Sequence, residues 1–405
     1  MAKKGTNLIN SIDEVQAFAK LFPDSSKVLL TGGGKQFVER IGIEAIRKTI
    51  YSVMVGDNIR SQTEFVSRRR IAQISGAVIV MIAKGYATIP DFQQKTSTLA
   101  VDWLRMTKKS DNAETWPSRW LLGLTGKGDQ NVLRSDVNAF INYIEEFEKA
   151  IREAARHCLQ ELGEYTIDLN YSTKEAKGTI KLDWEGIAKL TTAIGAQTLT
   201  IRGSDKSMYG KLFERLILGS YLTMLGFKRV NPERNVETDK VFWLSDSRQN
   251  RESDATALIR AGKVVKFDIG FIGKGNSEIS KDKLSRFDKE LEIAGRKSSA
   301  TTFIVVDRLP QTSKTEEAAK KIEAEIIQMS MQYWPKELCQ RLNKRCGFEH
   351  EILKVPDEKL QIYIQDKLSS IKLQDFLSDV TIEELTEPIS EEEDTVVSED
   401  EAEYS

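Results

Sequence analysis

Hydrophobic positions in the first 160 residues recur at the three- and four-residue steps of amphipathic helices. The first such segment opens with Ser11 and Glu14, whose spacing matches a capping box. Helical spacing continues through residues 35–56 and 60–85, each ending at a glycine, and through residues 135–165. The pattern therefore predicts a mostly helical N-terminal region over residues 1–165.

A different texture begins near residue 165, where two short β-like pieces, YTIDLNYS and GTIKLDW, follow one another. An amphipathic helix over residues 206–226 comes next, preceded by the polar loop GSDKS at residues 203–207. Further segments are expected as an aromatic strand (240–245), a β-hairpin (251–276), a helix (277–297), an apolar strand (300–307) and a polar-faced helix (313–331). This order predicts an α/β (α+β) fold with a small mixed sheet flanked by helices.

The predicted hairpin sorts its residues by parity. In the stretch KVVKFDIGFI the odd positions are large and apolar, whereas the even positions are Lys266, Asp268 and Gly270. With a loop at residues 260–262 and Gly262 in the left-handed conformation, the register places Asp254 directly opposite Asp268. Thr256 would then lie opposite Lys266. The sequence thus predicts two aspartates as cross-strand neighbours on one face.

Like charges directly opposed destabilise a sheet, so a compensating group is expected. Mg²⁺ takes one or two carboxylates together with waters and phosphate oxygens, so Asp254 and Asp268 become candidate metal ligands for a phosphate-containing substrate. The plain alternative is a pair of solvated surface aspartates. Lys266 on the same face, and the space that Gly270 clears beside it, favour the metal site. A cation near the scissile phosphate could be Lys266 or Lys283 of the following helix, and the sequence does not choose between them.

These residues carry a resemblance. The order of Glu214 in a helix, Asp254 opening a strand, Asp268 in the next strand, and then a helix and an apolar strand resembles the PD-(D/E)XK nuclease core. The stretches RESDATALI, FDIGFIGKGN and EISKDKLSRF are similar to those of the CfrBI-type type II restriction endonucleases, over most of residues 25–310. The resemblance implies Mg²⁺-dependent cleavage of double-stranded DNA at a short specific site.

On that resemblance Asp254 and Asp268 are the metal carboxylates, and Glu214 is the accessory acid. One position departs from the general pattern, because Gly270 stands where the core usually has its lysine. The resemblance therefore leaves the catalytic lysine at Lys266 or Lys283, or absent.

Charge is segregated along the chain. The formal net charge is -2, but 12 of the 61 acids lie between Asp379 and Ser405, which leaves 49 acids against 59 bases in the body. A body about ten charges positive suits a polyanionic partner such as DNA. The acidic end, from residue 376, is expected to be a disordered tail. It reads either as a solubilising end, which we favour, or as a DNA mimic that folds back on the body.

Candidate DNA contacts lie in two places. They are the arginine cluster Arg60, Arg68, Arg69 and Arg70, and Lys206 in the polar loop before the Glu214 helix. The cluster could contact phosphates or guanine edges, and a solvated helix face is an equal alternative. The glycine run TGGGK at residues 31–35 lacks the full P-loop spacing, so it reads as a turn before a helix.

The three cysteines and two histidines are too few and too scattered for a disulfide framework or a zinc site. The sequence shows no secretory signal pattern and no long uncharged apolar run, so we expect a cytoplasmic protein without membrane contact.

Together these patterns predict three units: a helical DNA-recognition region (1–165), a PD-(D/E)XK-like nuclease core with C-terminal helices (166–375) and the tail (376–405). A palindromic site would call for a homodimer, and a restriction enzyme implies a methyltransferase that protects the same site. Two rival classes remain: a structure-specific repair or recombination nuclease, and a non-catalytic DNA-binding protein on the same fold.

Overall fold

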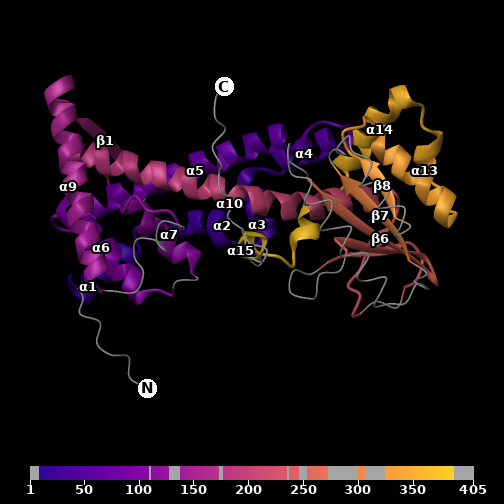
Figure 1. The fold of residues 1–405 in the computed structure, drawn as a ribbon, viewed down its shortest axis with the longest axis horizontal. Coiled ribbons are helices and arrows are strands. Elements are labelled where there is room, and N and C mark those ends of the chain that lie inside the picture. Colours follow the sequence, from indigo (N-terminus) through magenta and orange to yellow (C-terminus); the bar gives the residue numbers. More distant parts are fainter. Residues whose placement is uncertain are drawn as a thin grey trace, which may run out of the picture.

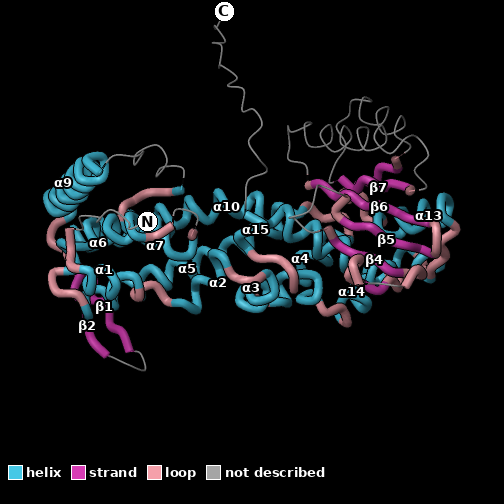
Figure 2. Tube along the Cα trace, turned by 90° about the horizontal axis from the view of Figure 1, so that it is seen from below, coloured by secondary structure: helices cyan, strands magenta, loops and turns pink. Residues whose placement is uncertain are grey.

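The computed structural model describes residues 9–108, 111–126, 137–172, 177–234, 237–245, 253–271, 300–306 and 324–386. The molecule is elongated, with helices at one end and a β-sheet at the other (Figures 1 and 2). One long helix runs between the two ends. The mixed α/β class expected from the sequence is confirmed.

The N-terminal part is helical, as predicted. Its helices are α1 (Ile12–Ala19), α2 (Asp24–Thr31), α3 (Gly34–Ile41), α4 (Ile43–Met54), α5 (Ile59–Thr88), α6 (Phe92–Met106), α7 (Asn112–Leu121) and α9 (Val137–Leu162). Ser11 and Glu14 form the expected capping box at the start of α1. The glycine run forms a turn between α2 and α3, and Gly42, with φ of 109°, separates α3 from α4.

The two β-like pieces form an antiparallel hairpin of β1 (Ile167–Ser172) and β2 (Lys177–Leu182). Helix α10 (Trp184–Met224) then continues for 41 residues. The predicted loop at residues 203–207 is wrong, because those residues lie inside α10. Buried side chains on both sides of it, Ile201 and Met208, supply the packing that keeps the helix intact.

A six-stranded mixed sheet forms the other end of the molecule. Its strands lie in chain order: β3 (Lys228–Arg229), β4 (Val241–Leu244), β5 (Ala255–Arg260), β6 (Lys263–Gly270), β7 (Thr301–Val306) and β8 (Glu325–Gln328). The β4–β5 and β5–β6 pairs are antiparallel, whereas β6–β7 and β7–β8 are parallel. The C-terminal half of α10 contacts β3 to β6 and so covers the sheet.

Strand β8 corrects the predicted helix over residues 313–331 at its C-terminal end. Ile327 is fully buried beside Val305 of β7, so the apolar residues of this short segment extend the sheet. Helices α13 (Trp334–Cys346) and α14 (Asp357–Ser369) follow, with a 3₁₀ turn η1 (Glu351–Lys354) between them. Tyr221 of α10 packs against Trp334 and donates a hydrogen bond to the carbonyl of Pro335, which joins α10 to α13.

The chain after residue 372 returns to the body, in the 3₁₀ turn η2 (Leu373–Leu377) and the short helix α15 (Ile382–Thr386). The predicted start of the tail at residue 376 is therefore wrong, because residues 376–386 are part of the fold. The apolar side chains of this stretch are buried: Phe376, Leu377, Val380, Ile382 and Leu385. Residues 387–405 lie outside the described residues.

Helix α5 is the one helix among the described residues that is long and apolar enough, by length and composition, to cross a membrane. A buried helix of a soluble protein passes the same test, and α5 packs against α4 and α10. Val66, Ile74, Val78 and Met81 of α5 belong to the hydrophobic core, whereas Phe65 and Val80 are exposed.

Candidate active site

The β5–β6 hairpin has the face pattern that the sequence predicts. Val265, Phe267 and Ile269 are fully buried, and Thr256 pairs with Lys266 as expected. The turn differs slightly, since Arg260 rather than Ile259 pairs with Lys263 after a register shift. Gly262 has a φ of 74°, the left-handed conformation assigned to it.

Asp254 lies just before β5, half-buried, where β5 stops pairing with β6. Its Oδ2 accepts a hydrogen bond of 2.8 Å from the backbone amide of Ile269. The carboxylate thus takes the place that a backbone carbonyl would have in a continued ladder. This bond fixes Asp254 to the residue that directly follows Asp268.

Asp268 is buried, with 4% of its surface exposed. Its neighbour on β7 is Ile304, which is 1% exposed, so an apolar wall stands on that side. Burying a carboxylate is costly unless a cation or hydrogen-bond donors compensate. A buried aspartate beside a second, anchored aspartate is a donor set that fits a hard divalent cation such as Mg²⁺.

Lys266 is half-buried and lies two residues before Asp268, on the same face of β6. Gly270, two residues after Asp268, pairs with Val306 of β7 and brings no side chain to that face. Of the two candidate lysines, Lys266 is the one that the structure describes, and it lies on the face of Asp268. Lys283 lies outside the described residues.

Glu214 lies on α10, half-buried, on the part of the helix that covers the sheet. The next residue, Arg215, is buried and reaches from the helix to the end of β4, where it donates a hydrogen bond to the carbonyl of Ser245. The amide of Ser245 donates in turn to the carbonyl of Asp254 at 3.1 Å. Arg215 and Ser245 were missed in the sequence, because their partners are distant in the chain and neither belongs to a motif.

The arginine cluster divides into different environments. Arg68 and Arg69 are exposed: Arg68 pairs with Glu64, and Arg69 donates to the carbonyl of Ile41. Arg60 lies on α5 and Lys206 lies on α10.

Arg70 is fully buried between α5 and α10. Its Nη1 lies 2.6 Å from the Asp205 carboxylate, and its Nε donates to the carbonyl of Leu29. Burial and the nearby Asp205 carboxylate raise the pKa of Tyr209 far above its usual range. These contacts give Arg70 a role in joining helices, so we do not include it among the proposed DNA contacts.

Among the described residues, no group of three or more His, Cys, Asp or Glu side chains converges as a metal site. The candidate centre therefore consists of the two carboxylates Asp254 and Asp268, with Lys266 on the same face and Glu214 on the covering helix.

Comparison with known proteins identifies the family of the chain. The model of the CfrBI restriction endonuclease family matches residues 43–314, which includes α5, α10 and the hairpin. The type II restriction enzyme CfrBI of Citrobacter freundii is 30% identical over 356 residues, which are 86% of this chain and 95% of that enzyme. The chain belongs to the CfrBI restriction endonuclease family. No solved structure matches it.

Membership of this family confirms the resemblance to the CfrBI-type restriction endonucleases. The match to the CfrBI enzyme extends over both the helical end and the sheet, because it spans 86% of the chain. The helical region is therefore part of what this family shares, along with the segment that holds the two aspartates.

Proposed function

We propose that this protein is a type II restriction endonuclease, which hydrolyses phosphodiester bonds in both strands of DNA at a short specific site. The observation that carries the proposal is the match to the CfrBI enzyme along 95% of that enzyme's length. The hairpin supports it with chemistry, since Asp254 is anchored by the amide next to the buried Asp268.

In this proposal Asp254 and Asp268 hold Mg²⁺, within a PD-(D/E)XK-like core. The ion would lower the pKa of a bound water and offset charge on the phosphate. Lys266 lies on the face of Asp268 and orients the attacking water or stabilises the developing negative charge. Glu214 is the accessory acid, supplied by the helix that covers the sheet.

DNA contact is assigned to the helical region. Arg68 and Arg69 present exposed guanidinium groups on α5, and Arg60 and Lys206 belong to the same two helices, α5 and α10. A palindromic site would be cut by a homodimer, because a two-fold axis presents one active site to each strand. A cognate methyltransferase would protect the host's sites, and both enzymes would act in the cytoplasm, the location typical of restriction enzymes.

The test is digestion of a sequenced plasmid with and without Mg²⁺, beside Asp254→Asn and Asp268→Asn variants. We expect discrete fragments with the wild-type protein and none in EDTA. Either variant should lower the rate by about two to three orders of magnitude, by analogy with the loss of other charge-stabilising groups. A smear without fixed ends would favour a structure-specific nuclease. Binding without cutting under every divalent metal would favour a non-catalytic DNA-binding protein.

The choice of lysine is tested by Lys266→Met beside Lys283→Met. We expect the first change to lower the single-turnover cleavage rate about 10²-fold or more, the range of a lost general acid or base. The second should leave most of the rate. The reverse order would assign the role to Lys283.

A further inference from the structure

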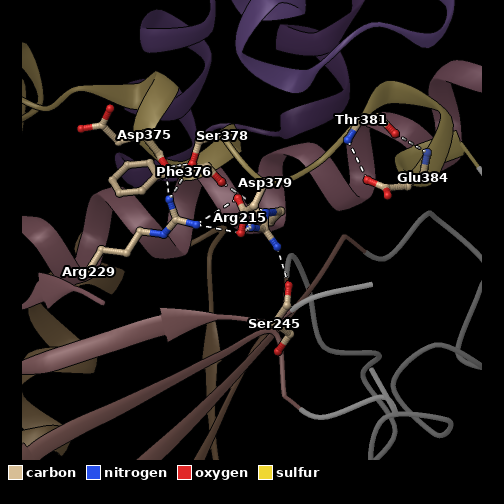
Figure 3. A network of polar contacts seen from close by, with 9 residues as sticks. All are labelled: Arg215, Arg229, Ser245, Asp375, Phe376, Ser378, Asp379, Thr381 and Glu384. Carbon is tan, nitrogen blue, oxygen red and sulfur yellow. Dashed lines mark hydrogen bonds and ion pairs between the residues drawn. The ribbon is translucent and has the colours of Figure 1, made fainter. Parts of the chain in front are cut away.

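The segment from Leu373 to Thr386, here called the C-terminal strap, contacts three separate parts of the molecule. It packs on α10, lies against the turn between α2 and α3, and reaches the arginines near the sheet (Figure 3). Neither the expected catalytic residues nor the expected DNA contacts include any part of it.

On the side of the helical region, the strap pairs with the glycine run. The amide of Gly34 donates to the carbonyl of Val380, and the amide of Ile382 donates to the carbonyl of Gly32, each at 2.8 Å. A Cβ atom at Gly34 would lie 3.1 Å from Cβ of Leu377. Gly34 thus has a structural use that the sequence did not reveal, because its missing side chain lets the strap approach.

On α10, the strap uses a second glycine. A Cβ atom at Gly219 would lie 2.7 Å from the ring of Phe376, a distance that forces one of the two to move. The ring of Phe376 in turn lies 6.5 Å, centre to centre, from that of Phe242 in β4. The strap therefore packs between the long helix and strand β4 of the sheet.

Near the sheet, the carboxylate of Asp379 contacts two arginines. Its carboxylate lies 3.1 Å from Nη2 of Arg215 and 2.9 Å from Nη2 of Arg229, the last residue of β3. Arg215 also donates to the carbonyls of Phe376 and Ser245. Figure 3 shows both guanidinium groups converging on Asp379, while the carboxylate of Asp375 points away from them.

Four links then connect the strap to the candidate metal site. Arg215 donates to the carboxylate of Asp379 and to the carbonyl of Ser245. The amide of Ser245 donates to the carbonyl of Asp254, and the carboxylate of Asp254 accepts from the amide of Ile269, the residue after Asp268. Arg215 is also the direct neighbour of Glu214. Because Arg215 is buried, the groups that hold its guanidinium, Asp379 among them, set its orientation.

We infer that the C-terminal strap is a positioning element of the active site, and that Asp379, acting through Arg215 and Ser245, sets the position of Asp254 for metal binding. The inference rests on the proposed function, since it takes Asp254 as a metal ligand. Groups that orient metal ligands commonly change metal affinity or activity by about 10- to 100-fold when they are removed.

The test compares Asp379→Ala with Asp375→Ala, the same change four residues earlier in a carboxylate that does not face the arginines. We expect Asp379→Ala to raise the Mg²⁺ concentration for half-maximal cleavage about tenfold and to lower kcat, with KM for DNA within about twofold. Asp379→Glu should recover part of the loss, and the control should match the wild type.

A second test changes the side of α10 on which the strap packs. Gly219→Ala pushes against Phe376, whereas Gly195→Ala changes an α10 glycine with open space around it. We expect the first to raise the Mg²⁺ requirement and the second to leave it unchanged. If Asp379→Ala and Gly219→Ala lower only the melting temperature and keep the wild-type Mg²⁺ dependence, the strap is merely structural and the inference is wrong.

Hydrogen exchange supplies a readout that needs no cleavage. The amides of Ser245 and Ile269 should exchange faster in Asp379→Ala than in Asp375→Ala, because both amides bind Asp254. If the wild-type protein cuts no DNA, the proposed function fails while this measurement still tests the strap. Unchanged exchange in a variant of an active enzyme overturns the strap alone.

Discussion

The two ends of the molecule handle buried acids in opposite ways. In the helical end, Asp205 pairs with the buried Arg70, and Asp102 accepts hydrogen bonds from the backbone amides of Ile9 and Asn10. In the sheet, the buried Asp268 lies one residue from the amide that anchors Asp254, a second acid. Asp205 and Asp102 lie against groups that offset their charge, whereas Asp254 and Asp268 bring two acids to the same end of one hairpin.

The comparison implies that removing charge should have opposite effects at the two ends. A balanced pair loses stability when one partner is neutralised, because the other is left buried and unpaired. A pair of like charges gains stability from the same change. The largest effect is expected in the helical end.

Asp205→Asn should lower the free energy of unfolding by about 3–5 kcal/mol, the cost of leaving a buried charge such as Arg70 unpaired. The urea midpoint in EDTA measures it. The control is Glu64→Gln, which breaks the exposed contacts of Glu64 with Arg68 and Arg202 and should cost much less. Equal losses in both variants would show that burial does not set the value of the Arg70 pair.

Asp268→Asn should raise the free energy of unfolding in EDTA by up to about 1 kcal/mol, the range of a cross-strand charge pair. Added Mg²⁺ should then stabilise the wild-type protein and not the variant, because the proposed function assigns Asp268 as a ligand of the ion. Asp168→Asn provides the control, since Asp168 is an exposed strand residue opposite Lys181. A loss of stability in Asp268→Asn would mean that the fold, without metal, already balances this acid.

The hairpin at the sheet end was largely predictable, because the pattern that predicts it lies in consecutive residues. Alternation in residues 263–271 separates the buried face from the face of Lys266 and Asp268, and Gly262 marks the turn. The register then follows from the turn, to within the shift at its end. Strand β8 was not predicted, because its four residues lie within a stretch whose pattern is also typical of a polar-faced helix.

The strap and the continuous α10 were not predictable, because both depend on contacts between distant segments. The residues GSDKS are typical of a loop, but they lie in a helix that packs on α5, where Asp205 pairs with Arg70. Asp379 stands first in a run of acids and so reads as tail, although its partner Arg215 lies 164 residues earlier. Spacing along the chain carries no information about such pairs.

The smallest effect concerns pH, at His350 beside the sheet. Burial lowers the pKa of His350, opposed by Glu351 and aided by Lys367 and Lys240, and its Nδ1 accepts a hydrogen bond from the amide of Ile352. A folded-state pKa below the unfolded value means that the folded protein prefers the neutral ring. This contribution to stability is present above the unfolded pKa of about 6.5 and is lost as pH falls from there through the lower folded pKa.

We therefore expect the free energy of unfolding to decline between pH 7 and pH 5.5, and to decline less in His350→Asn, whose side-chain oxygen can still accept the Ile352 amide. Urea titrations across this range measure the difference. Glu325 titrates lower: burial alone would raise its pKa, but its hydrogen bonds with Arg345 and Arg341 outweigh burial and lower it. The contribution of Glu325 to stability is present above the unfolded pKa of 4.5 and is lost as pH falls through its lower folded pKa. The pH range of Glu325 therefore lies below that of His350. Identical slopes above pH 5.5 in both proteins would assign the decline to groups other than His350.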